Sequence, residues 1–309
     1  MSAAVKKSVQ HSGMAAIVGR PNVGKSTLLN ALVGEKIAIV SKVPQTTRNQ
    51  VRGIYGDERG QIVFVDTPGL HRVKDRLDQF MKSTAMGSLN DTDVIIHLVD
   101  AMDSVGADEE ELVRRLAALE IPVIVGFNKV DKGDRCIPEY IGLWERMSGK
   151  KITELKNVVI VPLSGKSGLN LDKLLDLLFE RLPPGPPLYP QDTVCDIPQR
   201  MVMADIIREK LLNVMREEVP HSLAVIIESI EPRRKKTQHI NALILVEKDS
   251  HKSIVIGKSG SVLKKIGTLA RTELEDLLES RVYLEIHVKV KKDWRDNIEY
   301  LQQMGYDSI

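Results

Sequence analysis

The sequence predicts two domains, an α/β domain with a mostly parallel sheet followed by a smaller α+β domain. Its 309 residues exceed the roughly 100–200 residues of one typical domain. Residues 14–182 alternate short apolar runs with helix-periodic stretches, which is typical of a parallel sheet covered on both faces. Residues 183–190 hold five prolines and one glycine, so we expect a semi-rigid linker there. The expected parts are an N-terminal extension, 1–13, the α/β domain, 14–182, the linker, 183–199, and the second domain, 200–309, which ends in a helix.

The first domain should contain five strands, each followed by a helix. The apolar runs are short enough for strands, and the stretches between them carry apolar residues at helical spacing. The predicted strands are 14–18, 61–65, 94–100, 122–127 and 158–162. The predicted helices are 26–33, 77–89, 108–119, 138–147 and 170–182.

The second domain has a different predicted order, α-β-β-α-α-β. A helix over 199–218 is indicated by apolar residues at positions 203, 206, 207, 211, 214 and 215. A polar turn, 231–238, is expected between the first two strands, and a glycine-punctuated segment, 254–267, leads into a helix that ends near 279. The predicted strands are 223–230, 239–246 and 281–290, and a closing helix is predicted over 293–304.

Composition excludes several classes of protein. Lys and Arg number 44 and Asp and Glu 42, a formal net charge of +2, which argues against a uniformly basic nucleic-acid coat or an acidic tail. No apolar run approaches the about 20 residues that span a bilayer, and residues 1–13 lack the apolar core of a signal peptide. The only cysteines, Cys136 and Cys195, form no zinc-binding pattern. We therefore expect a cytoplasmic protein without a disulfide framework.

A glycine-rich segment lies between the predicted strand 14–18 and the predicted helix 26–33. It fits the pattern GxxxxGK[ST], in which the backbone wraps around phosphate and a helix N-terminus faces it. Lys25 should reach the β- and γ-phosphates, and the Ser26 hydroxyl should bind Mg²⁺. The segment therefore predicts a P-loop nucleoside triphosphatase. The residues assigned to this site are Gly19, Arg20, Pro21, Asn22, Val23, Gly24, Lys25, Ser26 and Thr27.

Two further motifs follow predicted strands. Asp66 suits the surroundings of the metal ion, and the Gly69 N–H is expected near the γ-phosphate. The Asp131 carboxylate can accept hydrogen bonds from N1–H and the 2-amino group of guanine, donors that adenine does not offer there. This combination favours GTP over ATP. The residues concerned are Asp66, Thr67, Pro68 and Gly69 in the first motif and Asn128, Lys129 and Asp131 in the second.

Together these motifs resemble those of the bacterial Era family of GTPases. The segments that carry the likeness are GRPNVGKS at 19–26, VPQTTRNQVRG at 43–53, DTPGLH at 66–71, NKVD at 128–131 and GKSG at 257–260. The resemblance covers essentially the whole chain and implies a Ras-like GTPase domain joined to a type II KH domain. It also implies Mg²⁺-dependent hydrolysis of GTP to GDP and binding to small-subunit (16S) ribosomal RNA near its 3′ end. A role in biogenesis of the 30S subunit follows, and we expect a monomer.

The resemblance also assigns single residues. Thr47 matches the switch threonine that closes on Mg²⁺ and the γ-phosphate, although Thr46 beside it leaves the register open. Ser164 and Gly165 occupy the loop that contacts guanine, largely through a backbone N–H, and Gly165 stands where alanine is common in the family. A glycine there should be tolerated with some loss of rigidity.

The residues after Gly69 bear on the rate of hydrolysis. Leu70 stands where Ras-type enzymes carry a glutamine that orients the attacking water. Leucine has no polar atom for that task, so we expect slow intrinsic hydrolysis. His71 is interpreted as an exposed loop residue rather than a catalytic base.

The second domain carries a GxxG segment at 257–260. In KH domains such a loop clamps about four nucleotides. The pattern also occurs at 53–56 and 165–168, but only the copy at 257–260 is preceded by a predicted α-β-β order. Residues 233–265 hold nine basic residues against two acidic ones, as a nucleic-acid surface requires. The predicted RNA-binding residues are Ile256, Gly257, Lys258, Ser259, Gly260, Lys264, Arg233 and Arg234.

No aromatic residue lies in 233–265, which argues against an RNA-recognition motif or an OB-fold. Aliphatic side chains such as Ile254, Ile256 and Ile266 are expected to form the floor of the groove instead.

A second hypothesis is a nucleotide-gated switch whose C-terminal domain docks on a membrane or protein surface. Its support is the basic segments 233–236 and 289–292. The likeness to Era also implies a peripheral association with the inner face of the cell membrane. RNA recovered by crosslinking would favour the first hypothesis, and salt-reversible binding to anionic vesicles without RNA would favour the second.

Overall fold

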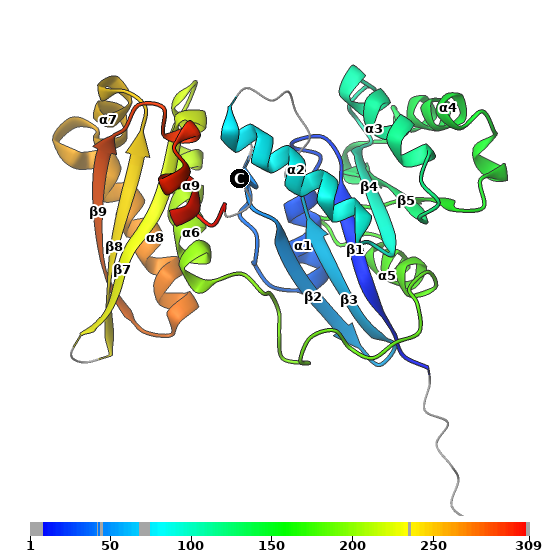
Figure 1. Ribbon diagram of the computed structural model, residues 1–309, viewed down its shortest axis with the longest axis horizontal. Helices are drawn as coiled ribbons and strands as arrows, with labels where there is room; N and C mark the ends of the chain where they lie inside the picture. The colour runs from blue at the N-terminus through cyan, green and yellow to red at the C-terminus, as the bar shows by residue number, and fades with distance from the viewer. Residues whose placement is uncertain (1–8, 42, 44–45, 68–74, 234–235, 307–309) are drawn as a thin grey trace, which may run out of the picture. The chain divides into compact units, whose positions relative to one another are not determined.

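In the computed structural model, residues 9–41, 43, 46–67, 75–233 and 236–306 are described. The chain divides into two compact units. The first consists of Met1–Ala38, Thr47–Arg72 and Met81–Asp196, and the second of Ile39–Thr46, Val73–Phe80 and Ile197–Ile309. As predicted, the first is an α/β unit and the second an α+β unit (Figure 1).

The first unit is built on a six-stranded sheet with the order β2-β3-β1-β4-β5-β6. All neighbouring strands run parallel except β2, which pairs antiparallel with β3 at the edge. The sequence did not predict β2, because its glycines and charged residues break the apolar pattern. The strands are β1 (His11–Val18), β2 (Val51–Asp57), β3 (Gly60–Asp66), β4 (Val94–Asp100), β5 (Val123–Asn128) and β6 (Val158–Pro162).

Helices cover both faces of this sheet (Figure 1). On one face, α3 and α4 pack against β1, β4 and β5, with Trp144 and Tyr140 fully buried. On the other, α1 and α5 contact β3. The five predicted helices are all present, as α1 (Lys25–Val33), α2 (Arg76–Asn90), α3 (Ala107–Ala117), α4 (Ile137–Ser148) and α5 (Leu171–Phe179).

The parallel strands bring the predicted nucleotide motifs to one edge of the sheet. The carboxyl ends of parallel strands meet at the same edge, and there the connecting loops form a crevice for ligands. The P-loop follows β1, Asp66 ends β3, Asp100 ends β4 and Asn128 ends β5. Residues far apart in the sequence are thus neighbours in space.

The proline-rich linker is hydrogen-bonded to the first unit along much of its length. Its backbone meets the edge strand, since the Ile54 N–H donates to Val194 O at 2.9 Å. The Gln61 side chain accepts from the N–H groups of Leu188 and Tyr189, both at 2.8 Å, and donates to Tyr189 O. The linker is therefore docked on the first unit by these hydrogen bonds as far as Val194.

The second unit has the predicted order α-β-β-α-α-β. Its sheet has the order β7-β8-β9, with β7 and β8 antiparallel and β8 and β9 parallel. Alternate residues of the strands pack with α6 and α8 into one core cluster. The elements are α6 (Gln199–Val214), β7 (Leu223–Arg233), β8 (Thr237–Val246), α7 (Asp249–Ile256), α8 (Ser261–Leu278), β9 (Arg281–Val290) and α9 (Ile298–Gln303).

Several element boundaries differ from the prediction, and the largest differences in the second unit have local causes. The first helix ends at Val214 rather than 218, because the following residues leave the helical region and Glu217 takes a positive φ of 56°. Most of the polar turn 231–238 belongs to β7 and β8, whose pairing continues to Arg233 and Thr237. The closing helix begins only at Ile298, since Asn297 caps it by accepting the Tyr300 N–H.

Among the described residues, no helix has the length and apolar character needed to cross a membrane.

Candidate functional site

The P-loop takes the wrapped conformation that its glycines predict. Gly24 has φ +105°, and a Cβ there would come within 2.4 Å of Asn128 Nδ2. Only glycine satisfies both conditions. Helix α1 begins at the next residue, Lys25, so its first N–H groups and its positive dipole end face the loop. This is a ready-made site for an anion.

Lys25 is buried beneath this loop. Its Nζ donates to the carbonyl oxygens of Gly19 and Arg20, both at 3.0 Å. Burial lowers the pKa of Lys25, while the carboxylates of Asp66 and Glu109 act in the opposite direction. The ammonium is thus held by loop carbonyls at the place where the motif predicts β- and γ-phosphates.

Ser26, Thr47 and Asp66 form one cluster. Ser26 Oγ lies 2.9 Å from Thr47 Oγ1 and donates to Asp66 Oδ2 at 2.8 Å, and Thr47 Oγ1 lies 3.3 Å from the same carboxylate oxygen. Thr46 instead bonds Val43 O. The geometry therefore favours Thr47 over Thr46 as the residue that faces the metal position.

This cluster fits Mg²⁺. Asp66 Oδ1 is buried and has no hydrogen-bond partner among the described residues, and burial raises the pKa of this carboxyl. Two hydroxyl oxygens and one carboxylate are hard oxygen donors, which Mg²⁺ prefers together with phosphate oxygens. The described residues contain no group of three or more His, Cys, Asp or Glu placed to hold a metal ion. Because Mg²⁺ prefers octahedral coordination, phosphate oxygens and water would complete the shell that Ser26, Thr47 and Asp66 begin.

Asn128 joins the P-loop to the loop after β6. Its Nδ2 donates to Val23 O at 2.8 Å, and its Oδ1 accepts the Gly165 N–H at 3.0 Å. A Cβ on Gly165 would lie 3.1 Å from Leu28 Cα in α1. The absence of a side chain at Gly165 therefore allows the loop to approach α1 closely.

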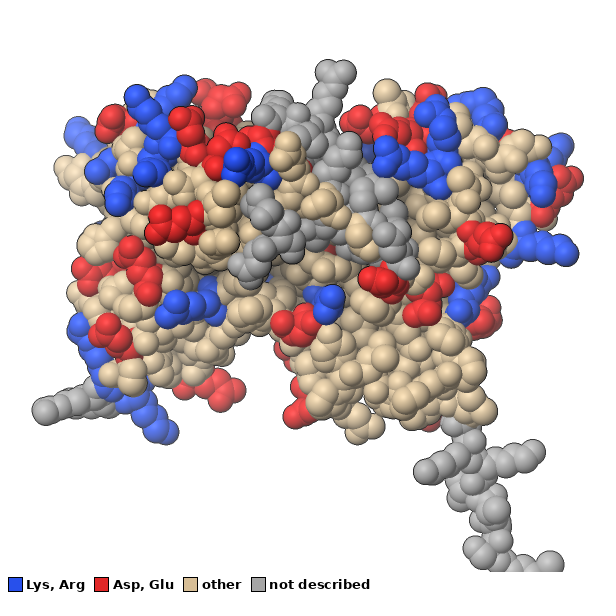
Figure 2. Space-filling view, in the orientation of Figure 1, with Lys and Arg blue, Asp and Glu red and all other residues tan. Residues whose placement is uncertain are grey.

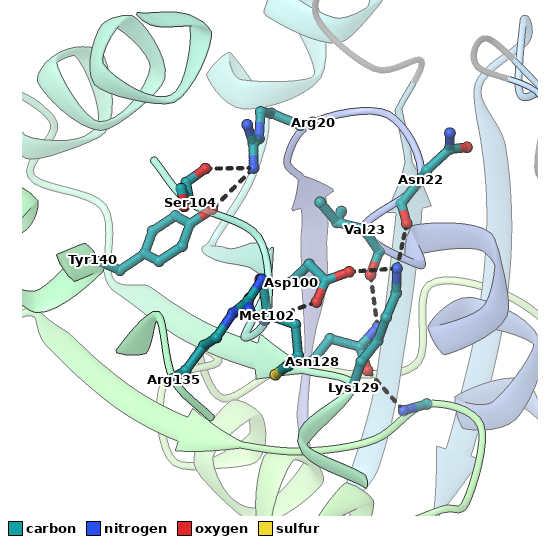
Figure 3. A network of polar contacts seen from close by, with 11 residues as sticks. Arg20, Asn22, Val23, Asp100, Met102, Ser104, Asn128, Lys129, Arg135 and Tyr140 are labelled. Carbon is teal, nitrogen blue, oxygen red and sulfur yellow. Dashed lines mark hydrogen bonds and ion pairs between the residues drawn. The ribbon is translucent and has the colours of Figure 1, made fainter. Parts of the chain in front are cut away.

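Lys129 makes a second tie to the P-loop. Its Nζ donates to Asn22 O at 2.7 Å and to Asp100 Oδ2 at 2.6 Å (Figure 3). Asp100 was not predicted as a site residue. Its position at the end of an apolar strand, like that of Asp66, was the available indication.

Asp131 stands exposed next to the loop that carries Ser164. A hydrogen bond from the Ser164 side chain holds the pKa of Asp131 below its ordinary value. The buried Ser164 Oγ in turn accepts the Ser167 N–H at 3.1 Å. This hydrogen bond therefore favours the ionised carboxylate, which presents two acceptor oxygens.

A buried network behind the P-loop was also missed. Arg20 Nε lies 2.8 Å from Oε2 of Glu109, a carboxylate with no exposed surface, whose other oxygen lies 2.6 Å from His97 Nε2. Arg20 also donates to Ser104 O and to the Tyr140 hydroxyl (Figure 3). The Arg20 side chain therefore bonds residues of α3 and α4. Only the backbone of Arg20 is left to contact a nucleotide. Sequence patterns could not pair residues so distant in the chain.

The remaining predicted site residues make few described contacts or lie outside the described residues. Thr67 donates its hydroxyl to Ile17 O at 3.0 Å and is buried. Pro68, Gly69, Leu70 and His71 of the first unit and Arg234 of the second lie outside the described residues.

The GxxG segment of the second unit joins α7 to α8. Gly257 has φ +73°, and a Cβ there would come within 2.4 Å of Val262 Cγ2. Lys258–Gly260 forms a short 3₁₀ turn, and α8 begins immediately after it. Backbone N–H groups and a helix N-terminus are therefore exposed together, as a phosphate clamp requires.

A groove of about 470 Å³ runs from this segment between α8 and β9. Lys264, Gly267, Thr268 and Arg271 line it at helical spacing, so they share one face of α8. The aliphatic residues that line it are Leu263, Val282, Leu284 and Ile286, and not Ile254, Ile256 and Ile266, which were expected there. Ile266 is buried in the core, and Ile254 is 50% exposed elsewhere. Arg271 and Tyr283 line the groove without having been predicted.

Basic side chains gather near both ends of this region. Figure 2 shows lysines and arginines over α7 and again beside the tip of the β7–β8 hairpin. Along the chain, Lys258 belongs to the GxxG segment, and Lys264 and Arg271 follow it on α8. Arg233 is the last residue of β7, at the hairpin. The positive charge is therefore local, in a protein whose net charge is only +2.

Comparisons with known proteins identify a family for each part of the chain. A family model described as 50S ribosome-binding GTPase matches residues 14–129, and a KH domain model matches residues 218–295. The chain is 46% identical to GTPase Era of Halothermothrix orenii, over 96% of this chain and 98% of that protein. It is 45% identical to GTPase Era of Heliobacterium modesticaldum, over 96% and 97%.

Two solved structures cover the chain equally well. A crystal structure of Era in complex with MgGDPNP and nucleotides 1506–1542 of 16S ribosomal RNA is 41% identical, with a TM-score of 0.89, over 96% of this chain and 99% of that chain. A crystal structure of a variant of Aquifex aeolicus Era bound to GDP·AlF4⁻ is also 41% identical, with a TM-score of 0.88 and the same coverage. With these identities over nearly the full length, the chain belongs to the Era family of GTPases.

Proposed function

We propose that this protein binds and hydrolyses GTP with Mg²⁺, binds 16S ribosomal RNA near its 3′ end and acts in biogenesis of the 30S subunit. The observation that carries the proposal is the meeting of Ser26, Thr47 and Asp66 beside the buried Lys25, in a chain that also holds a KH domain. An Era protein has been crystallised with a magnesium-bound GTP analogue and 16S RNA together, which supports both halves of the proposal.

The chain's own residues have distinct tasks toward the phosphates. The N-terminus of α1 and the P-loop backbone bind them, and Lys25 supplies positive charge at the β- and γ-phosphates. Ser26, Thr47 and Asp66 would hold Mg²⁺, which neutralises charge that develops on the phosphate oxygens. Leu70 cannot orient a water molecule, so we expect slow intrinsic turnover until another group positions the water.

Guanine specificity is assigned to Asp131. The carboxylate would accept from N1–H and the 2-amino group, and the hydrogen bond from Ser164 lowers its pKa. Asp131→Asn should weaken GTP binding and shift preference toward xanthosine triphosphate, whose 2-oxo group accepts from an amide. Competition between GTP, XTP and ATP measures this preference, and tight ATP binding by the unsubstituted protein would overturn the assignment.

The RNA is assigned to the GxxG segment and to the groove between α8 and β9. Exposed backbone N–H groups at 257–260 would bind phosphates, and Lys258 and Lys264 add charge. We place the protein in the cytoplasm, with peripheral membrane association as the alternative that the basic segments 233–236 and 289–292 suggest.

Two titrations test the proposal. The full chain is titrated with a synthetic RNA of 16S nucleotides 1506–1542, once with a GTP analogue and once with GDP, and then with anionic vesicles. We expect saturable RNA binding, with an RNA affinity that differs between the GTP analogue and GDP. By linkage, bound RNA must then change the ratio of the affinities for the two nucleotides by the same factor. Vesicle binding with no RNA binding would contradict the proposal and favour a membrane switch.

A further inference from the structure

Glu109 places a buried carboxylate in the first turn of α3. Its side chain has no exposed surface, and burial of an ionised carboxylate is costly unless partners offset the cost. The N-terminal turn of a helix favours a negative charge, and α3 begins at Ala107. The remaining offset must come from the groups that contact the two carboxylate oxygens.

Each carboxylate oxygen of Glu109 faces a partner. Oε2 lies 2.8 Å from Arg20 Nε, and Oε1 lies 2.6 Å from His97 Nε2. Because an ionised carboxylate only accepts, the Nε2 atom of His97 carries the hydrogen of this bond. His97 is a buried residue of β4, and the centre of its ring lies 5.9 Å from that of Trp144 on α4. His97 therefore holds Glu109 in the orientation that meets Arg20.

The Arg20 side chain extends from the P-loop toward α3 and α4 (Figure 3). Besides its contact with Glu109, it donates to Ser104 O at 3.1 Å and to the Tyr140 hydroxyl at 3.2 Å. Gly106 leaves room for it, since a Cβ there would lie 3.3 Å from Arg20 Nη1. Several segments of the first unit thus fix one guanidinium group, and Glu109 is the partner that carries the opposite charge.

The backbone of Arg20 in turn holds Lys25. Lys25 Nζ donates to the carbonyl oxygens of Gly19 and Arg20, both at 3.0 Å. Arg20 is thus fixed at its side chain by Glu109, while its carbonyl oxygen fixes the ammonium group. Burial lowers the pKa of Lys25, and the charges of Asp66 and then Glu109 oppose that shift. Glu109 therefore acts on Lys25 through Arg20 and also through its charge.

We propose that Glu109 is a positioning residue of the nucleotide site, which fixes Arg20 and through it the P-loop carbonyl oxygens that hold Lys25. The inference rests on the proposed GTP-binding function. A loop that is already ordered loses less freedom on binding, so loss of the contact between Arg20 and Glu109 should lower nucleotide affinity. GDP and GTP should be affected alike, because the P-loop and Lys25 contact the β-phosphate that both possess.

The test separates charge from shape at Glu109. Glu109→Gln keeps the length of the side chain and removes its charge. Glu111→Gln is the matched control on the same helix, because Glu111 pairs with Arg115 at the exposed surface. GDP and a GTP analogue are titrated with Mg²⁺ into the full chain by isothermal calorimetry, below the unfolding midpoint of each variant. Glu109→Gln should weaken both nucleotides about tenfold, the effect of one hydrogen bond to a charged group, and Glu111→Gln should weaken neither by more than about twofold.

The ³¹P resonance of bound GDP distinguishes positioning from a general loss of stability. The β-phosphate resonance depends on the groups that contact this phosphate, and at saturating GDP it comes from the folded complex alone. Glu109→Gln should shift this resonance, whereas Glu111→Gln should leave it in place. A loss of stability by itself lowers the amount of complex but does not move the resonance.

Arg20→Met tests whether Glu109 acts through Arg20. Methionine removes the guanidinium and keeps an unbranched side chain. Arg20→Met should weaken GDP about as much as Glu109→Gln does, and the double variant should stay within about twofold of either single variant. The double variant removes both charges of the pair and leaves neither unmatched, so it measures the same loss if Glu109→Gln does not fold.

The outcomes separate this inference from the function it rests on. Unchanged GDP affinity of Glu109→Gln, an unmoved β-phosphate resonance, losses that multiply in the double variant, or full GDP affinity of the double variant would each overturn the positioning role and leave GTP binding intact. If the unsubstituted protein bound neither GDP nor the GTP analogue, the proposed function would fall and the positioning role with it.

Discussion

The nucleotide site and the RNA groove are built in opposite ways. In the first, polar side chains at several strand ends bond one another, as Lys129 with Asp100 and Ser26 with Asp66, or bond the loop backbone, as Asn128 does. In the second, backbone at 257–260 and exposed side chains such as Lys264 line an open groove. A site made of buried partners is rigid and couples binding to stability, while a surface groove can change its affinity without cost to the fold.

Substitution of Asp66 should give the largest effect and expose this coupling. Asp66→Asn removes the carboxylate of the proposed Mg²⁺ position, so Mg²⁺-dependent affinity for GTP should fall at least about 100-fold. The same change should stabilise the nucleotide-free protein, because burial raises the pKa of Asp66 and an ionised carboxylate is costly there. Isothermal titration and thermal unfolding measure the two effects.

The stabilisation by Asp66→Asn should depend on pH in a definite direction. A raised folded-state pKa means that the contribution of Asp66 to stability is full at acid pH and is lost as pH rises through that value. Asp66→Asn should therefore raise the midpoint of unfolding by about 2 °C or more at neutral pH and change it little at acid pH. An unchanged or lower midpoint at neutral pH would contradict the account.

Substitution in the GxxG segment should give the converse result. Replacing Lys258 and Ser259 together by aspartate sets two carboxylates against the RNA backbone, so RNA affinity should fall by at least about 2 kcal/mol. Both residues lie on an exposed turn outside the nucleotide site, so intrinsic GTP affinity and the unfolding midpoint should stay unchanged. Lys291→Asp with Lys292→Asp changes the net charge by about as much, −4 against −3, and serves as a control for net charge. Equal losses in both double variants would mean that the segment is only a turn.

The smallest effect is expected at Ser164. Ser164→Ala removes the hydrogen bond that lowers the pKa of Asp131, so a larger share of the carboxyl will be protonated as pH approaches its ordinary value of about 4. GTP affinity of the variant should therefore fall more steeply than that of the unsubstituted protein between pH 7 and pH 4. Ser167→Ala is the control, because Ser167 bonds Ser164 through its backbone only. Parallel pH profiles would contradict the assignment.

The same contrast explains what the sequence could predict. Local patterns located the P-loop, Asp66, Asn128 and nearly every strand, because phosphate-binding motifs and apolar runs consist of residues that are adjacent in the sequence. Patterns did not reveal Asp100 beside Lys129 or Glu109 between Arg20 and His97, since these pairs form only when distant strands and helices meet.

In the second unit the missed features have another cause. Edge strand β9 carries Tyr283 outside the basic stretch 233–265, so a search for aromatics in that stretch could not find it. The floor of the groove was assigned to Ile266, which faces the core because the helix begins at Ser261 and sets which residues turn inward. Helix phase therefore decides the groove lining, and phase depends on the boundary that sequence reasoning fixes least well.

One chain is proposed to join a guanine-nucleotide site to a domain that binds 16S ribosomal RNA. The most direct test of this proposal is sequencing of the RNA crosslinked in cells to the protein loaded with GTP, beside the variant with Lys258 and Ser259 replaced by aspartate. We expect reads concentrated at the 3′ end of 16S RNA for the unsubstituted protein and their loss in the variant. Reads spread over unrelated RNAs, or equal recovery by both proteins, would contradict it.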